Sequence, residues 1–253
     1  MDALSVLMYV TVAVLGLVAG SFFNVVICRY ISGESILRPA SRCLSCLTSL
    51  KPKDLVPIVS YLALRGKCRY CGAKLSRRYP LVEASSSGLF LLCYHYFELS
   101  PQLVQYAVIF SLLLIISVID IESHIIPNRL VLILFAWVLL WQLLFPTITP
   151  VSALGGFFTG GILFFAIALL SKGGMGGGDV KLMAVLGFAT GVPYVFFVFL
   201  LAFISGAVVG ILLMIFKKKT RKSPIAFGPF LSLAFFWMAI WGEQIWSWYF
   251  SFT

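Results

Sequence analysis

Two aspartates stand apart from the rest of the chain because each lies at the end of a long apolar run. Asp120 ends the segment SVID, and Asp179 closes the glycine-rich run GGMGGGD at residues 173–179. The chain has nine acidic residues, and only four of them are aspartate. An ionisable side chain at the edge of the hydrocarbon region of a membrane is costly, which makes it a candidate functional group. We therefore take Asp120 and Asp179 as the candidate catalytic residues.

A pair of carboxylates can hydrolyse a peptide bond without a metal ion or a covalent intermediate. One carboxylate, ionised, acts as the general base that activates water, and its protonated partner donates to the carbonyl oxygen. Two like charges held close together do not both ionise readily, so the pair titrates as a coupled unit. Asp179 begins a predicted helix whose dipole favours its ionised form, which would leave the proton to Asp120.

Simpler interpretations exist for each residue taken alone. Asp179 could cap a helix, and Asp120 could end one at a hydrated interface. The glycines could form a flexible connector, or could let a substrate backbone approach closely. Residues i and i+2 on a helix do not face each other, so neither aspartate is paired with its charged neighbour. We expect a supporting role, toward the substrate or the loop, for Gly176, Gly178, Glu122 and Lys181.

The elements that would position these residues are membrane helices. The chain is 61% hydrophobic, with a mean hydropathy of +1.03, which is too apolar for a soluble core of this size. Apolar runs of about twenty residues match a hydrocarbon core about 30 Å thick. We expect an all-α, polytopic membrane protein with about eight transmembrane helices, at 4–27, 81–97, 103–121, 127–145, 151–171, 180–190, 192–216 and 226–250. The sixth is too short to span on its own.

The basic residues fix the predicted topology. Residues 29–78 carry eleven Lys and Arg, and residues 217–222 carry five more. A basic chain can bind nucleic acid, but these segments adjoin apolar runs, so we expect a positive-inside signal that faces anionic membrane lipids and no nucleic-acid partner. Both basic segments would then be cytoplasmic and both termini outside. We expect three parts: a first transmembrane helix at 1–28, a cytoplasmic insert at 29–80, and a bundle at 81–253 that carries both aspartates.

The insert holds two CxxC pairs, Cys43 with Cys46 and Cys68 with Cys71, separated by twenty-one residues. Two such pairs bring four thiolates around one Zn²⁺ in tetrahedral geometry. The alternative, four unrelated cysteines, is disfavoured by the spacing, and a reducing compartment disfavours disulfides. A closed site with four thiolates is structural, so we expect zinc to stabilise the insert. The sequence contains neither an HExxH motif nor a GxSxG motif, so it gives no support for a zinc metalloprotease or a serine hydrolase of those classes.

In this order, the motifs resemble those of the bacterial type IV prepilin peptidases, which are membrane aspartyl proteases of the GxGD type. The resemblance covers nearly the whole chain. Small departures fall in the loops, such as Ala226 where the family often has proline. The motifs are GSFFNVVI at 20–27, the two cysteine pairs, SRRYPLVE at 76–83, DIESHIIPN at 120–128, GGGDVKL at 176–182 and FGPF at 227–230.

The resemblance implies a substrate and a second activity. Prepilins and pseudopilins of type IV pilus, type II secretion and competence systems would be cut after a glycine at the cytoplasmic face of the inner membrane. Many members also methylate the new N-terminus with S-adenosylmethionine, so the resemblance implies a possible N-methyltransferase activity. Two alternatives stay open at this point: an ion- or proton-coupled transporter with a zinc-stabilised loop, and a non-enzymatic assembly factor of a secretion system.

Overall fold

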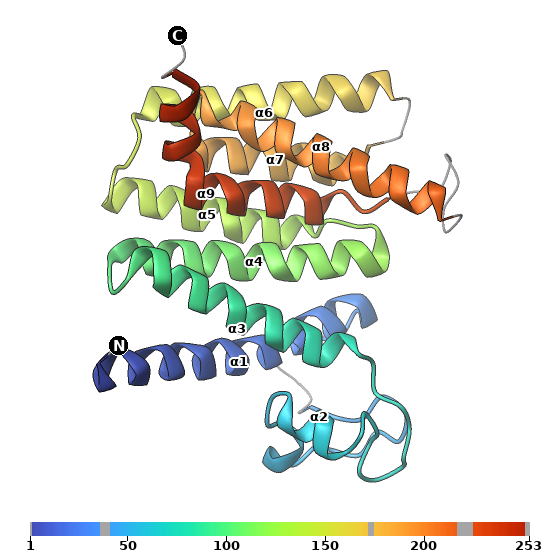
Figure 1. Cartoon of the computed structure of the whole chain (residues 1–253). Helices are drawn as coiled ribbons and strands as arrows, with labels where there is room; N and C mark the ends of the chain where they lie inside the picture. The colour runs from blue at the N-terminus through green and yellow to red at the C-terminus, as the bar shows by residue number, and fades with distance from the viewer. Residues whose placement is uncertain (1, 36–40, 172–174, 217–224, 251–253) are drawn as a thin grey trace. The chain divides into compact units, whose positions relative to one another are not determined.

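The computed structural model describes residues 2–35, 41–171, 175–216 and 225–250. Over these residues the chain is helical, and its β structure is limited to two isolated bridges. It forms two compact units, an N-terminal unit at Met1–Ile115 and a C-terminal unit at Ile116–Thr253. The boundary falls inside α4 (Pro101–Ser123), drawn in green in Figure 1.

The N-terminal unit is built on a close pair of helices, α1 (Ala3–Ser32) and α3 (Arg78–Phe97). Gly16 and Gly20 lie one turn apart on α1. A Cβ atom at Gly16 would lie 2.6 Å from Ser87 Cα, and one at Gly20 would lie 2.7 Å from Glu83 Cα. The two backbones therefore touch along a small-xxx-small stripe, which is a common way for membrane helices to associate.

The insert between α1 and α3 contains two short helices, η1 (Pro52–Asp54) and α2 (Val59–Ala63). α1 continues five residues beyond the predicted end at residue 27 and stops where Gly33 adopts a φ of 71°. The first residues of the predicted insert are therefore helical. The backbone N–H of Ile58 donates to Glu83 Oε2 over 2.7 Å, which ties the insert to the start of α3.

The C-terminal unit is arranged around a short central helix, α7 (Gly177–Thr190), of 14 residues. α7 contacts α5 (Asn128–Leu144), α6 (Pro150–Leu170), α8 (Tyr194–Ile215) and α9 (Gly228–Phe250). The closest approach is to α6, where a Cβ at Gly156 would lie 2.1 Å from the carbonyl oxygen of Gly187. Any larger residue there would push the helices apart, so glycine sets the position of α7.

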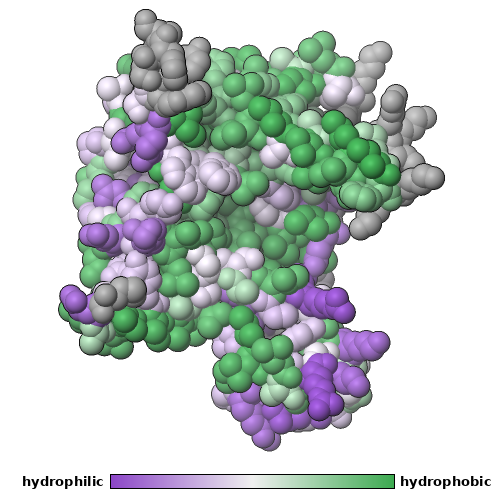
Figure 2. Space-filling view, viewed as in Figure 1, coloured by the Kyte–Doolittle hydropathy of each residue, from purple (hydrophilic) through white to green (hydrophobic). Residues whose placement is uncertain are grey.

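Helices occupy all eight of the predicted ranges. Among the described residues, however, only α1, α4, α6 and α8 are long and apolar enough to cross a membrane by length and composition, so the structure supports four of the eight predicted spans. α7 was expected to be too short to span, and at about 1.5 Å per residue it falls well short of the ~30 Å hydrocarbon core. Apolar side chains cover much of the visible helical surface in Figure 2, whereas the insert shows many hydrophilic ones. The basic run 217–222 lies outside the described residues.

Candidate active site and metal centre

Asp120 lies in the last turn of α4 and is only 4% exposed. The helix ends just beyond it, where His124 adopts a left-handed φ of 53° and its N–H donates to the Asp120 carbonyl oxygen over 2.8 Å. The carboxylate itself is held from another helix: Oδ2 accepts a hydrogen bond of 2.8 Å from the backbone N–H of Gly228. Because α9 begins at Gly228, the carboxylate occupies the positive end of the α9 dipole.

Gly228 leaves the space that this hydrogen bond needs. A Cβ atom there would lie 2.9 Å from Asp120 Oδ2. About one turn away, Ser117 Oγ donates to Ser232 Oγ over 2.9 Å, a second polar link between α4 and α9. Sequence reasoning recognised Gly228 only as part of the FGPF motif and did not identify it as a site residue. A Gly-Pro pair at a predicted helix start was the one available signal.

Asp179 lies in the first turn of α7 and is 8% exposed. Its Oδ2 accepts a hydrogen bond of 3.2 Å from the N–H of Gly176, so the residue does cap its own helix. The other carboxylate oxygen, Oδ1, is buried and has no hydrogen-bond partner among the described residues. The capping role accounts for one oxygen and leaves the second available for chemistry.

The segments that carry the two aspartates are in direct contact. A Cβ at Gly178 would lie 2.7 Å from Ile126 Cβ, which places the turn after α4 against the start of α7. A second contact joins the same regions, because Lys181 Nζ donates to Asn128 Oδ1 over 2.9 Å. Two residues far apart in the sequence thus bring their carboxylates into one part of the C-terminal unit.

The four predicted supporting residues lie in different surroundings. Gly176 supplies the N–H that Asp179 accepts, and Gly178 packs on Ile126. Lys181 is exposed and bonded to Asn128. Glu122 is exposed near the end of α4. Gly173 and Gly174 of the glycine run lie outside the described residues.

The four predicted cysteine ligands do come together in the insert. The Sγ atoms of Cys43, Cys46, Cys68 and Cys71 all lie within 4.8 Å of one another. Four sulfurs at about 2.3 Å from a tetrahedral Zn²⁺ are separated by about 3.8 Å, and Cys43 and Cys71 are 3.9 Å apart. The residues present therefore fit a zinc ion.

The two cysteine pairs share one backbone conformation. In each pair, the backbone N–H of the first cysteine donates to the carbonyl oxygen five residues later: Cys43 to Thr48, and Cys68 to Ala73. The carbonyl oxygen of the same cysteine accepts a hydrogen bond from the backbone N–H four residues later: Cys43 from Leu47, and Cys68 from Gly72. Leu47 and Gly72 take a positive φ, of 57° and 72°. The repeated turn aims each pair of thiols at the same point.

Asp54 connects η1 to the second cysteine pair. Its carboxylate accepts hydrogen bonds from Arg69 Nε at 2.6 Å and from the Tyr70 hydroxyl at 2.8 Å. Both donors lie between Cys68 and Cys71, so the aspartate fixes the turn that presents these ligands. The Arg69 guanidinium, ahead of the other partners, holds the pKa of Asp54 down at about 2.

Comparison with known protein families finds two matches along the chain. Residues 14–97 match the model of the Bacterial Peptidase A24 N-terminal domain, and residues 107–211 match the Type IV leader peptidase family. No solved structure shows a significant match to the chain.

Three curated relatives match along nearly their whole length, and each is named prepilin leader peptidase/N-methyltransferase. The protein of Bacillus subtilis is 33% identical over 93% of this chain and 95% of its own. That of Stutzerimonas stutzeri is 34% identical over 95% and 93%, and that of Pseudomonas aeruginosa 31% over 94% and 92%. With matching motifs, matching domains and this degree of identity over the whole chain, the protein belongs to the type IV leader peptidase family.

Proposed function

We propose that the chain is a membrane aspartyl endopeptidase that removes the leader peptide of type IV prepilins and pseudopilins. The observation that carries the proposal is that two buried carboxylates, Asp120 and Asp179, lie in segments that contact each other through Ile126 and Gly178. The names of the relatives supply the substrate class.

In the proposed mechanism one proton is shared by the pair. An ionised carboxylate activates water, and the protonated one donates to the carbonyl oxygen of the scissile peptide bond. Both carboxylates accept an N–H at a helix start, Asp120 from Gly228 and Asp179 from Gly176. A helix dipole therefore favours the ionised form of both residues and does not single out Asp120 as the protonated one. We assign the shared proton to the pair. The buried Oδ1 of Asp179, without a hydrogen bond, is where water would enter.

Four neighbours would support this reaction. Gly176 donates to Asp179 directly, and Gly178 lets the start of α7 lie against the turn after α4. Lys181 holds α7 to Asn128, and the exposed Glu122 stands near the basic leader expected of a substrate. These four residues are thus positioning or substrate-contact residues in the proposal, whereas only the two aspartates touch the reacting atoms.

The location follows from the apolar helices and the charge. We propose that the chain lies in the bacterial inner membrane with its basic loops cytoplasmic, its termini outside, and about eight spans. The insert at 29–80 would separate the first helix at 1–28 from the catalytic bundle at 81–253. The substrate would be cut after glycine at the cytoplasmic face, in pilus or type II secretion systems, and no nucleic acid would be bound.

The relatives' names include N-methyltransferase, and we propose the same second activity with S-adenosylmethionine as the methyl donor.

Zinc would act as a structural ion. Cys43, Cys46, Cys68 and Cys71 would hold it, and the metal would supply folding free energy to an insert that has a small core. Metal analysis of purified protein should find about one zinc per chain, with Cys93→Ala unchanged because Cys93 is buried in α3, outside the cluster. A folded preparation without zinc contradicts this part of the proposal.

The decisive experiment is coexpression with a prepilin. Asp120→Asn and Asp179→Asn should each leave the precursor uncut, because each variant lacks one of the two carboxyl groups that the proposed mechanism needs. Glu243→Gln, an exposed acidic residue of the same unit, is the matched control and should process normally. Processing by either aspartate variant contradicts the dyad. A non-enzymatic assembly factor would tolerate both changes, and the family favours neither that alternative nor a transporter.

A further inference from the structure

A groove of about 750 Å³ opens on the C-terminal unit between α5, α6 and α7. Its size is within the range of about 300–1,000 Å³ that is common for small-molecule sites. Only two of its lining residues are polar, and none is acidic. It is lined by Asn128, Val131, Leu132, Phe135, Phe157, Phe158, Gly161, Ile162, Phe165, Val180, Lys181, Ala184 and Val185.

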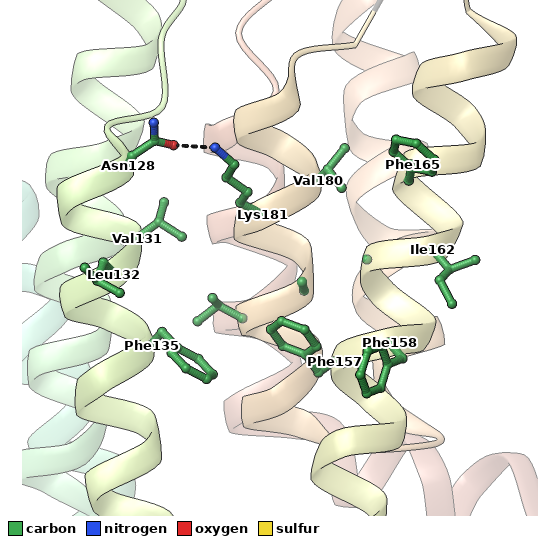
Figure 3. A pocket seen from close by; sticks show the side chains of 13 residues that line it. Asn128, Val131, Leu132, Phe135, Phe157, Phe158, Ile162, Phe165, Val180 and Lys181 are labelled. Carbon is green, nitrogen blue, oxygen red and sulfur yellow. Dashed lines mark hydrogen bonds between the residues drawn. The ribbon is translucent and has the colours of Figure 1, made fainter.

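The two polar residues lie together at one end of the groove (Figure 3). Lys181 Nζ donates to Asn128 Oδ1 over 2.9 Å, and both residues are exposed. The ammonium has further N–H groups to donate, and the Asn128 amide nitrogen is also a donor. Asn128 is the first residue of α5 and Lys181 is the fifth of α7, so both lie near helix starts, where the helix dipoles add positive potential. This end of the groove is suited to an anion.

The other end is aromatic. Figure 3 shows Phe135, Phe157 and Phe158 at the end opposite the polar pair. The groove is open along its length, because Leu132 is 66% exposed and Ile162 is 64% exposed. α6, which forms one wall, is among the helices that are apolar and long enough to cross a membrane. A ligand that fits has an anionic head and a long apolar tail, and it can enter sideways from the lipid.

The groove lies on the side of α7 away from the catalytic aspartate. At 100° per residue, Val180, Lys181, Ala184 and Val185 are centred about half a turn from Asp179. The substrate segment next to the scissile bond belongs on the Asp179 side, so it is not the natural occupant of this groove.

We propose that the groove binds one anionic phospholipid, with its phosphate on Lys181 and Asn128 and an acyl chain along the phenylalanines. The argument is charge complementarity: one cation and no acidic residue at the mouth of an apolar groove, in a membrane whose cytoplasmic leaflet is anionic. A lipid there would bridge the starts of α5 and α7, which the Asn128–Lys181 hydrogen bond joins. The lipid would thus help to hold the start of α7.

Native mass spectrometry of the delipidated full chain can test this site with phosphatidylglycerol and phosphatidylcholine as the probes. We expect the first phosphatidylglycerol to bind about fivefold more tightly than phosphatidylcholine, the effect of about one basic residue near a headgroup. Lys181→Gln should abolish the preference, and Lys181→Arg should retain it. Arg129→Gln is the matched control, because Arg129 is exposed beside Asn128 but does not line the groove, and it should leave the preference unchanged.

A second measurement leaves the polar pair intact. A photoreactive residue at Ile162, in the groove, should capture phosphatidylglycerol in preference to phosphatidylcholine from mixed bilayers. The same residue at Ile204, which is 59% exposed on α8, should capture the two lipids in the bilayer ratio. Equal headgroup ratios at both positions, or an undiminished preference in Lys181→Gln, overturn the proposal. Displacement of the lipid by a peptide with a basic leader and an apolar helix would also overturn it, in favour of substrate.

Discussion

The Asp120 carboxylate accepts a hydrogen bond from the backbone N–H of Gly228, 108 residues later in the chain. The donor is the first residue of α9, so the position of one candidate catalytic residue depends on where another helix begins. A Cβ at Gly228 would lie 2.9 Å from the same oxygen. The glycine therefore both donates the hydrogen bond and leaves room for the carboxylate.

Gly228→Ala should reduce prepilin cleavage with little loss of folding. The new methyl group displaces the Asp120 carboxylate, and misplacing a catalytic group by about 1 Å can cost about 100-fold in rate. We expect a fall of about 10- to 100-fold in kcat, measured on a purified prepilin in detergent. Gly88→Ala on α3 adds a methyl group in open space and should have no effect. Full activity of Gly228→Ala shows that the Asp120–Gly228 contact does not matter for catalysis.

Two adjacent glycines in the GGGD run should respond differently to alanine. At Gly178 the added Cβ lies 2.7 Å from Ile126 Cβ, so the main chain has to move, whereas at Gly177 nothing lies within 4 Å. We expect Gly178→Ala to lose most cleavage activity and Gly177→Ala to retain it. Ile126→Gly in the Gly178→Ala background removes the clashing atom and should restore part of the activity, but Ile126→Ala should not. Equal activity of the two alanine variants rules out a specific contact between Gly178 and Ile126.

Asp54→Asn should loosen the metal site without touching a ligand. The variant loses the charge that binds Arg69, within the second cysteine pair. The lowered pKa of Asp54, about 2, means that its stabilising effect is complete above about pH 4 and is lost as the pH falls toward 2. At neutral pH we expect about tenfold faster zinc transfer to a chromogenic chelator, at the low end of effects seen for residues that support metal ligands.

Glu34→Gln provides the control for that experiment. It removes the other described ion pair of the insert, Glu34 with Arg42, whose side chains are about one third exposed. Exposed pairs contribute about 0–1 kcal/mol, so zinc transfer should stay near the wild-type rate. Equal effects of the two variants indicate that general loss of charge, and not the Asp54 contact, controls the metal site.

Opposite changes at the two equivalent turn positions should have opposite effects on the stability of the insert. Leu47 adopts a left-handed backbone conformation, which costs about 1–2 kcal/mol for a residue with a Cβ atom. Its side chain is 61% exposed. Leu47→Gly should therefore stabilise the insert by up to about 1 kcal/mol, and Gly72→Ala should destabilise it by about that amount. Thermal unfolding of the zinc-bound protein, followed by zinc release, measures both. A lower unfolding temperature for Leu47→Gly indicates that the leucine makes a contact that outweighs its backbone strain.

Much of the fold follows from local sequence. The apolar runs predicted the eight helices α1 and α3 to α9, because hydrophobicity is a local property and a helix satisfies its own backbone hydrogen bonds. Their ends were less predictable: α1 runs to Ser32, because the left-handed residue that stops it is Gly33 and not a residue near 27. The cysteine site was also predictable, since a CxxC pair fixes two ligands within one turn.

By itself, the sequence determined that the chain has apolar helices, a four-cysteine insert and two aspartates at helix ends. Only the tertiary structure decided which groups meet: Gly228 with Asp120, Ile126 with Gly178, and Lys181 with Asn128 at the mouth of the groove. Hydropathy and spacing act over a few residues. The choice of partner depends on how closely helix backbones approach, as at Gly156 and Gly187, and on which face of α7 each neighbour covers. Those relations join residues far apart in the chain, so no local pattern in the sequence encodes them.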